Sequence, residues 1–150
     1  MALTAGYGFT GKTLRVDLTT RTVTVEDTIA KYGKFWGGTG MAYKVLWDEV
    51  PNTVANPYDP ANRIIFGWGP AAGTGVPCAG RTAITSLCPQ HGDALNPVIG
   101  APASGHMGGL FAAECKYAGW DGIIVQGKAS GPVYIAIKDD DVQIVDAPKL

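Results

Sequence analysis

The chain has 150 residues, a formal net charge of −1, 46% hydrophobic and 17% charged residues, and three cysteines. This balance indicates one globular domain over residues 1–150 rather than a disordered segment, and it gives no electrostatic basis for binding nucleic acid or an anionic membrane. We expect no membrane insertion and a cytoplasmic location, because no apolar run approaches the ~20 residues that cross a bilayer, no basic and apolar leader is visible, and the cysteines are odd in number and loosely spaced.

The first third of the chain predicts a hairpin followed by helices. Residues 13–18 and 22–26 alternate polar and apolar side chains, which favours a β-hairpin with one buried face. A short helix is expected over 28–35, with Thr28 as its cap. The glycine-rich residues 37–40 then open a second helix over 41–50.

The middle of the chain predicts strands. Residues 63–66 and 81–87 are short apolar strands, and 94–99 is a weaker one, which Pro97 would confine to a sheet edge. A third helix is expected to start near His106 and to stop at Gly119, because glycine commonly ends helices.

The last third predicts a buried strand over 122–127 and a second hairpin, 133–138 and 142–145, joined by a turn at 139–141. We therefore expect an α+β fold: a β-rich domain of two sheets, or one strongly bent sheet, with about three helices.

Two glycine-rich segments stand out as a candidate binding site. The loop 69–82 delivers one cation, Arg81, at the head of an apolar strand. Gly108 and Gly109 lie where a helix was expected to begin, and exposed amides at a helix start bind anions. A planar guanidinium can hold phosphate oxygens through two hydrogen bonds. A surface arginine that merely begins a strand is the alternative.

The order and spacing of several segments resemble the N-terminal domain of the aldehyde ferredoxin oxidoreductase family, enzymes that use tungsten or molybdenum held by two pterins. The matching segments cover nearly the whole chain: residues 11–19, 37–40, 68–81, 108–109, 114–120, 127–128 and 132–134.

The resemblance implies a function for the assembled enzyme. It would interconvert aldehydes and carboxylic acids, with electrons passing from the metal centre through a [4Fe–4S] cluster to ferredoxin or a similar carrier. This chain would form the floor of the pterin site. The cysteines that ligate the cluster lie in later family domains, so we expect the chain to need a larger catalytic part, either as a fragment or as a subunit, and to be inactive alone.

The resemblance also implies roles for four residues. Arg81 matches an arginine that donates to both the pterin and the cluster. The backbone carbonyl of His106 matches a ligand of a magnesium ion that bridges the pterin phosphates, although the family usually has Asn there. Gly108 matches a glycine in contact with the pterin, and Gly109 is expected to be needed for space.

Other site types are weaker interpretations. Residues 67–72 have the glycine spacing of a dinucleotide site, but the sequence that follows cannot form the required helix. Three cysteines and His91 lack the spacing of a zinc site, and residues 139–141 lack the rest of a calcium loop. A further alternative is a non-catalytic scaffold module that pairs with a larger oxidoreductase subunit. Residues 37–40 are interpreted as structural, with a possible cofactor role for Gly38 and Gly40.

Overall fold

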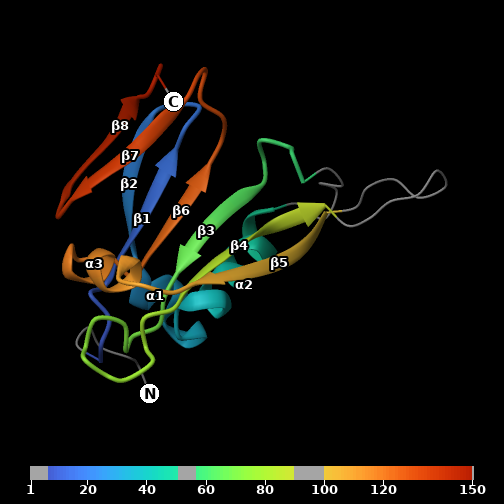
Figure 1. The fold of residues 1–150 in the computed structure, drawn as a ribbon. Coiled ribbons are helices and arrows are strands. Elements are labelled where there is room, and N and C mark those ends of the chain that lie inside the picture. Colours follow the sequence, from blue (N-terminus) through green and yellow to red (C-terminus); the bar gives the residue numbers. More distant parts are fainter. Residues whose placement is uncertain (1–6, 51–56, 90–99, 150) are drawn as a thin grey trace.

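The computed structural model describes residues 7–50, 57–89 and 100–149. Within them, a six-stranded sheet has the strand order β2-β1-β6-β3-β4-β5, and a separate two-stranded sheet is formed by β7 and β8 (Figure 1). The elements are β1 (Lys12–Asp17), β2 (Thr22–Asp27), α1 (Thr28–Tyr32), the 3-10 helix η1 (Gly33–Phe35), α2 (Gly38–Glu49), β3 (Arg63–Gly67), β4 (Thr82–Pro89), β5 (Gly100–Met107), α3 (Phe111–Tyr117), β6 (Gly122–Gln126), β7 (Val133–Lys138) and β8 (Asp141–Asp146).

The large sheet is mixed. Strands β1 and β6 run parallel, and every other neighbouring pair in this sheet is antiparallel. The expected α+β class with two sheets is confirmed, and the described residues hold three α-helices, as expected.

The two faces of the large sheet carry separate cores, because successive side chains of a strand point to opposite faces. One core lies against α3 and the β7–β8 hairpin, whose Ile135, Ile137, Val142 and Ile144 pack on it. The other lies against α2, which packs on β3 and β4. Neighbouring residues divide between them: Ile123 and Val125 belong to the first core and Ile124 to the second.

This layering corrects the prediction for the first hairpin. Strand β1 is buried on both faces, since Thr13, Leu14 and Val16 are all fully enclosed. Interior position in the sheet, between β2 and β6, outweighs the alternating pattern. The cap of α1 is Asp27, whose carboxylate accepts the Ala30 amide at 2.9 Å, whereas the hydroxyl of Thr28 bonds that of Thr13 at 2.7 Å.

Further boundaries differ from expectation. Residues 100–107 form strand β5, so His106 lies in a strand, and the third helix starts only at Phe111. Helix α2 begins three residues before the predicted start at Met41. The weak strand expected over 94–99 falls outside the described residues.

Glycine is required where α2 begins. Gly37 and Gly38 have φ of +73° and +53°, and the Gly38 amide donates to the Trp68 carbonyl at 3.1 Å. A Cβ on Gly37 would overlap that same carbonyl oxygen, and a Cβ on Gly40 would overlap the Phe35 carbonyl. The structural interpretation of this segment is confirmed, because its glycines allow close backbone approach.

Candidate functional site

Pairing between β4 and β5 brings the two glycine-rich segments together. Thr82 lies opposite Met107 in the antiparallel register, so Arg81, which directly precedes Thr82, and Gly108, which directly follows Met107, lie at the same end of the β4–β5 pair. On the other side of Arg81, a Cβ built on Gly80 would lie 3.3 Å from the Gly109 carbonyl oxygen. Arg81 is therefore held beside the Gly108–Gly109 backbone, although the two segments are more than twenty residues apart in the chain.

The Arg81 side chain is exposed and has no ion pair or hydrogen bond within the described residues. Strand β4 begins one residue after it, so Arg81 belongs to the loop end rather than to the strand. A guanidinium without a partner among the described residues can offer its five N–H donors to another molecule.

The glycine backbone beside Arg81 is open. Gly105, Gly108 and Gly109 are exposed, and a Cβ built on any of them would meet nothing within 4 Å. Gly109 has φ of +92°, so its backbone conformation also favours glycine, and the expected need for space there stays a prediction. His106 is exposed on β5, opposite Ala83.

A polar atom that sequence reasoning missed lies next to Arg81. Thr82 is completely buried, and its hydroxyl is without a hydrogen-bond partner in the described part of the chain. Such atoms are rare because an unpaired buried hydroxyl costs stability. A threonine at the start of a strand is ordinary in sequence, so no local signal marked it.

This corner fits an anionic group. It combines an unpaired guanidinium, exposed backbone at Gly108 and Gly109, and open space where side chains would otherwise stand. Helix α3 contributes less than expected, because it has seven residues and its N-cap, Leu110, makes no side-chain capping bond. Among the described residues, no three His, Cys, Asp or Glu side chains converge as a metal site.

The dinucleotide, zinc and calcium sites considered as alternatives do not form among the described residues. After Gly67–Gly69 the chain forms turns, not the helix of a dinucleotide fold. Cys78 is exposed, Cys88 half-buried and Cys115 buried, while His91 falls outside the described residues. The 139–141 segment forms the β7–β8 turn, with Asp141 already paired to Lys138.

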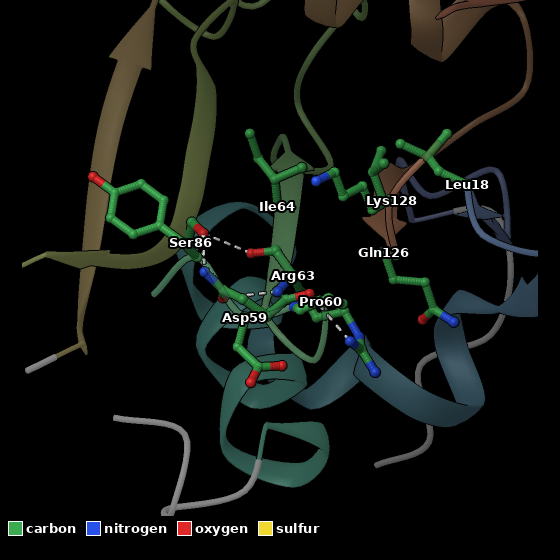
Figure 2. Close-up of a pocket in the computed structure, with 12 residues that line it drawn as sticks. Leu18, Asp59, Pro60, Arg63, Ile64, Ser86, Gln126 and Lys128 are labelled. Carbon is green, nitrogen blue, oxygen red and sulfur yellow. Dashed lines mark hydrogen bonds between the residues drawn. The ribbon is translucent and has the colours of Figure 1, made fainter. Parts of the chain in front are cut away.

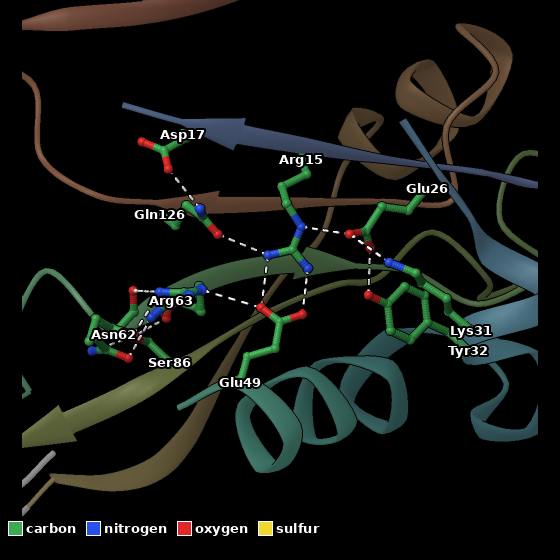
Figure 3. Close-up of polar contacts among 11 residues, drawn as sticks. Arg15, Asp17, Glu26, Lys31, Tyr32, Glu49, Asn62, Arg63, Ser86 and Gln126 are labelled. Atoms are coloured by element: carbon green, nitrogen blue, oxygen red, sulfur yellow. Dashed lines mark hydrogen bonds and ion pairs between the residues drawn. The ribbon is translucent and has the colours of Figure 1, made fainter. Parts of the chain in front are cut away.

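A half-buried charge network joins the large sheet to the end of α2 (Figure 3). Arg15 on β1 donates to Glu49 of α2 at 2.5 and 2.8 Å, to Glu26 at 2.7 Å and to Gln126 at 2.9 Å. Burial disfavours the charge of Arg15, but the hydrogen bonds to Glu49 and Glu26 outweigh it and raise the pKa of Arg15. Sequence reasoning missed this network because its members come from four separate elements.

Glu26 is the acceptor at one end of this network. It also accepts the Tyr32 hydroxyl at 2.6 Å and pairs with Lys31 at 2.9 Å. Burial would raise the pKa of Glu26, but the hydrogen bonds from Arg15, Tyr32 and Lys31 together lower it from 4.5 to about 2. The carboxylate therefore stays ionised throughout the physiological range.

A second hollow lies at the opposite end of β3 and β4 from Arg81. It is a cavity of about 270 Å³ whose lining includes Leu18, Ile64, Ser86 and Lys128 (Figure 2). The Ser86 hydroxyl, also on its wall, donates to the Arg63 carbonyl at 2.7 Å. Some polar groups that line this cavity therefore already form hydrogen bonds with each other.

Comparison with known proteins matches this chain to one family. The family model for the aldehyde ferredoxin oxidoreductase N-terminal domain matches residues 13–150. The tungsten-containing aldehyde ferredoxin oxidoreductase of Pyrococcus abyssi is 40% identical over 145 residues, which are 96% of this chain and 22% of that protein. The WOR-like subunit of an aliphatic sulfonate oxidoreductase from Pyrococcus furiosus is 36% identical over 148 residues.

Among solved structures, the active-site complex BamBC of benzoyl coenzyme A reductase with 1,5-dienoyl-CoA contains a similar fold. The TM-score is 0.84 at 38% identity, covering 95% of this chain and 20% of that one. The chain thus spans about a fifth of the length of the relatives it matches. Within the described residues, no helix is both long and apolar enough to cross a membrane.

Proposed function

This chain belongs to the aldehyde ferredoxin oxidoreductase family, and on that premise we propose that it forms the floor of the pterin site in a tungsten- or molybdenum-containing oxidoreductase. The assembled enzyme interconverts aldehydes and carboxylic acids and passes electrons through a [4Fe–4S] cluster to ferredoxin or a similar carrier. Support comes from relatives named as tungsten-containing aldehyde ferredoxin oxidoreductases, which are about 40% identical across nearly the whole chain.

The rest of the enzyme supplies what this chain does not contain. The relatives extend over roughly five times its matched length, since it covers 22% of them. We place the cluster ligands, the other half of the pterin pocket and the substrate channel in that larger part. When bound, the metal–pterin group supplies the redox chemistry, and the protein supplies binding, orientation and charge neutralisation.

Each residue of the corner has a role in this proposal. Arg81 donates through its guanidinium to oxygens of the pterin, which lysine could not do in a planar, two-point manner. The amides of the exposed Gly108 and Gly109 would hold the phosphate. The carbonyl of His106 would hold the magnesium ion that neutralises the phosphates, a role that does not require Asn in place of His.

The observation that carries the proposal is the Arg81 guanidinium, which has no partner in the described part of the chain and lies beside exposed glycine backbone. If Arg81 were only a surface arginine, binding would not explain the exposed backbone of Gly108 and Gly109 beside it. In a scaffold module, the alternative function, neither feature would affect the metal. The two functions therefore predict different outcomes when Arg81 is changed.

The test uses the assembled enzyme that contains this chain. Arg81→Ala is expected to lower tungsten or molybdenum and pterin content at least about tenfold, as for loss of a charge-assisted contact, with the circular dichroism spectrum unchanged. Arg81→Lys is expected to recover only part of the loss. Arg21→Ala is the matched control, because Arg21 is an exposed arginine that pairs with Asp146 on β8. Full metal content and activity in Arg81→Ala would favour the scaffold function.

A further inference from the structure

Helix α2 presents aromatic side chains on the face that points away from the core. Trp47 is 83% exposed, Tyr43 45% and Phe35, from η1, 39%. With Gly40 and Lys44 they line a cavity of about 490 Å³, which we name the α2 aromatic groove. Trp36, next in sequence to Phe35, is also largely exposed.

The groove is not a by-product of core packing. Met41, Ala42, Val45 and Leu46 already fill the inner face of α2, and the outer face of such a helix is normally polar. Partly exposed aromatic rings amount to several hundred Å² of apolar surface, on the order of the largest patch found on most monomers. A patch of this size marks a contact with another protein segment.

Local structure holds the groove in shape. The Lys44 ammonium lies 5.8 Å from the centre of the Phe35 ring and pairs with Asp48, so the charge at the rim is already neutralised. Gly40 allows α2 to lie directly against the Phe35 carbonyl. The groove thus offers an apolar floor with no unpaired cation, which favours an apolar occupant.

We propose that the α2 aromatic groove is the docking surface for the four fifths of the enzyme that this chain does not contain. The proposal rests on the proposed function and names where that larger part makes contact. The length of the relatives supports the proposal, because a polypeptide about four times larger must lie against some face of this domain.

The position of the groove selects this occupant over a second copy of the chain. The Tyr43 hydroxyl lies 3.4 Å from the Ser104 hydroxyl on edge strand β5, and His106 follows two residues later. A polypeptide that closes over the His106–Gly109 backbone from the β5 edge therefore passes beside Tyr43. The groove and the candidate pterin corner are thus both next to strand β5.

The first experiment is hydroxyl-radical footprinting of the native enzyme. Trp68 and Trp120 are both 1% exposed and serve as internal references for a buried tryptophan. Trp47 is expected to be oxidised as slowly as these two, and to lose that protection when the enzyme is unfolded in urea. Oxidation of Trp47 in the native enzyme as fast as in the unfolded one would overturn the proposal.

A photo-crosslinker identifies the occupant. With p-benzoylphenylalanine in place of Trp47, the crosslinked peptide is expected to come from outside residues 1–150. A crosslink to residues 1–150 of another copy, or to an unrelated protein, would overturn the proposal.

Variants separate this inference from the proposed function. Trp47→Glu is expected to reduce the yield of assembled enzyme at least about tenfold, whereas Trp47→Phe keeps an apolar ring and most of the yield. Arg81→Ala is expected to lose the cofactor but remain assembled. Normal assembly of Trp47→Glu together with cofactor loss in Arg81→Ala would overturn only the docking surface; the reverse pattern would overturn only the pterin site.

Discussion

Lys116 on α3 and Asp121 form an ion pair of 2.6 Å, with side chains that are only 8% and 1% exposed. Asp121 also accepts the backbone amides of Thr10 at 2.9 Å and Gly11 at 2.7 Å. The Lys116 ammonium lies 5.3 Å from the centre of the Phe9 ring. The buried Asp121 carboxylate therefore holds Thr10 and Gly11, just before β1, against the start of β6.

Asp121→Asn is expected to destabilise the domain by about 3–5 kcal/mol, because it leaves the Lys116 charge buried without its counter-ion. Two-state denaturation of the purified protein measures the change. The double variant Lys116→Met, Asp121→Asn is expected to regain part of the lost stability, since it buries no charge. If Asp121→Asn alone were as stable as the parent chain, the Lys116–Asp121 ion pair would not stabilise the fold.

The Glu26 carboxylate predicts a specific acid sensitivity. Its pKa is about 2 in the folded chain against an ordinary 4.5, so it contributes stability above pH 4.5 that is lost as the pH falls toward 2. A difference of this size corresponds to roughly 3 kcal/mol at most. Glu26→Gln is expected to cost about 1–3 kcal/mol at pH 7.

The diagnostic feature of Glu26→Gln is its pH dependence. The stability gap between the variant and the parent chain is expected to close between pH 4.5 and pH 2, as measured by urea denaturation at a series of pH values. Asp48→Asn serves as the control, because Asp48 is an exposed partner of Lys44 in an i, i+4 pair. A gap that does not depend on pH would exclude Glu26 as the titrating group.

The cysteines are expected to differ in reactivity. Burial, with a smaller contribution from the charge of Glu114, raises the pKa of Cys115 to about 11, so its thiol stays protonated and unreactive at pH 8. Cys78 is exposed in the glycine loop. Iodoacetamide at pH 8, followed by peptide mass spectrometry, is expected to label Cys78 in the folded chain and Cys115 only after unfolding; equal labelling rates in the folded chain would refute this.

Much of the secondary structure could be predicted from local patterns. The strands over 122–126 and 133–138 were recognised because runs of Ile and Val carry a strong signal. Strand β5 was not, because Gly, Ala and Ser side chains carry no apolar periodicity and its extended form depends on pairing with β4. Helix α3 was predicted to start near His106, before its actual start at Phe111, because β5 was not recognised as a strand.

The sequence predicted which residues belong to the candidate site, but not how they are arranged in space. Arg81, His106, Gly108 and Gly109 were chosen from the sequence, and their roles in binding stay predictions. Thr82 was missed, since its burial and unpaired hydroxyl exist only when β4 packs between its neighbours. The positive φ of Gly109 was not foreseen either, because a backbone angle cannot be read from composition.

By itself, the sequence determined the α+β class, most strand and helix positions, and membership in the family, because these depend on side-chain periodicity and on the spacing of motifs along the chain. Only the tertiary structure decided that Arg81 lies beside Gly109, that Arg15 joins β1 to α2, and that Tyr43 on the outer face of α2 lies next to β5. The physical reason is that these relationships arise from strand pairing and packing between residues far apart in the chain, whose register no local pattern specifies.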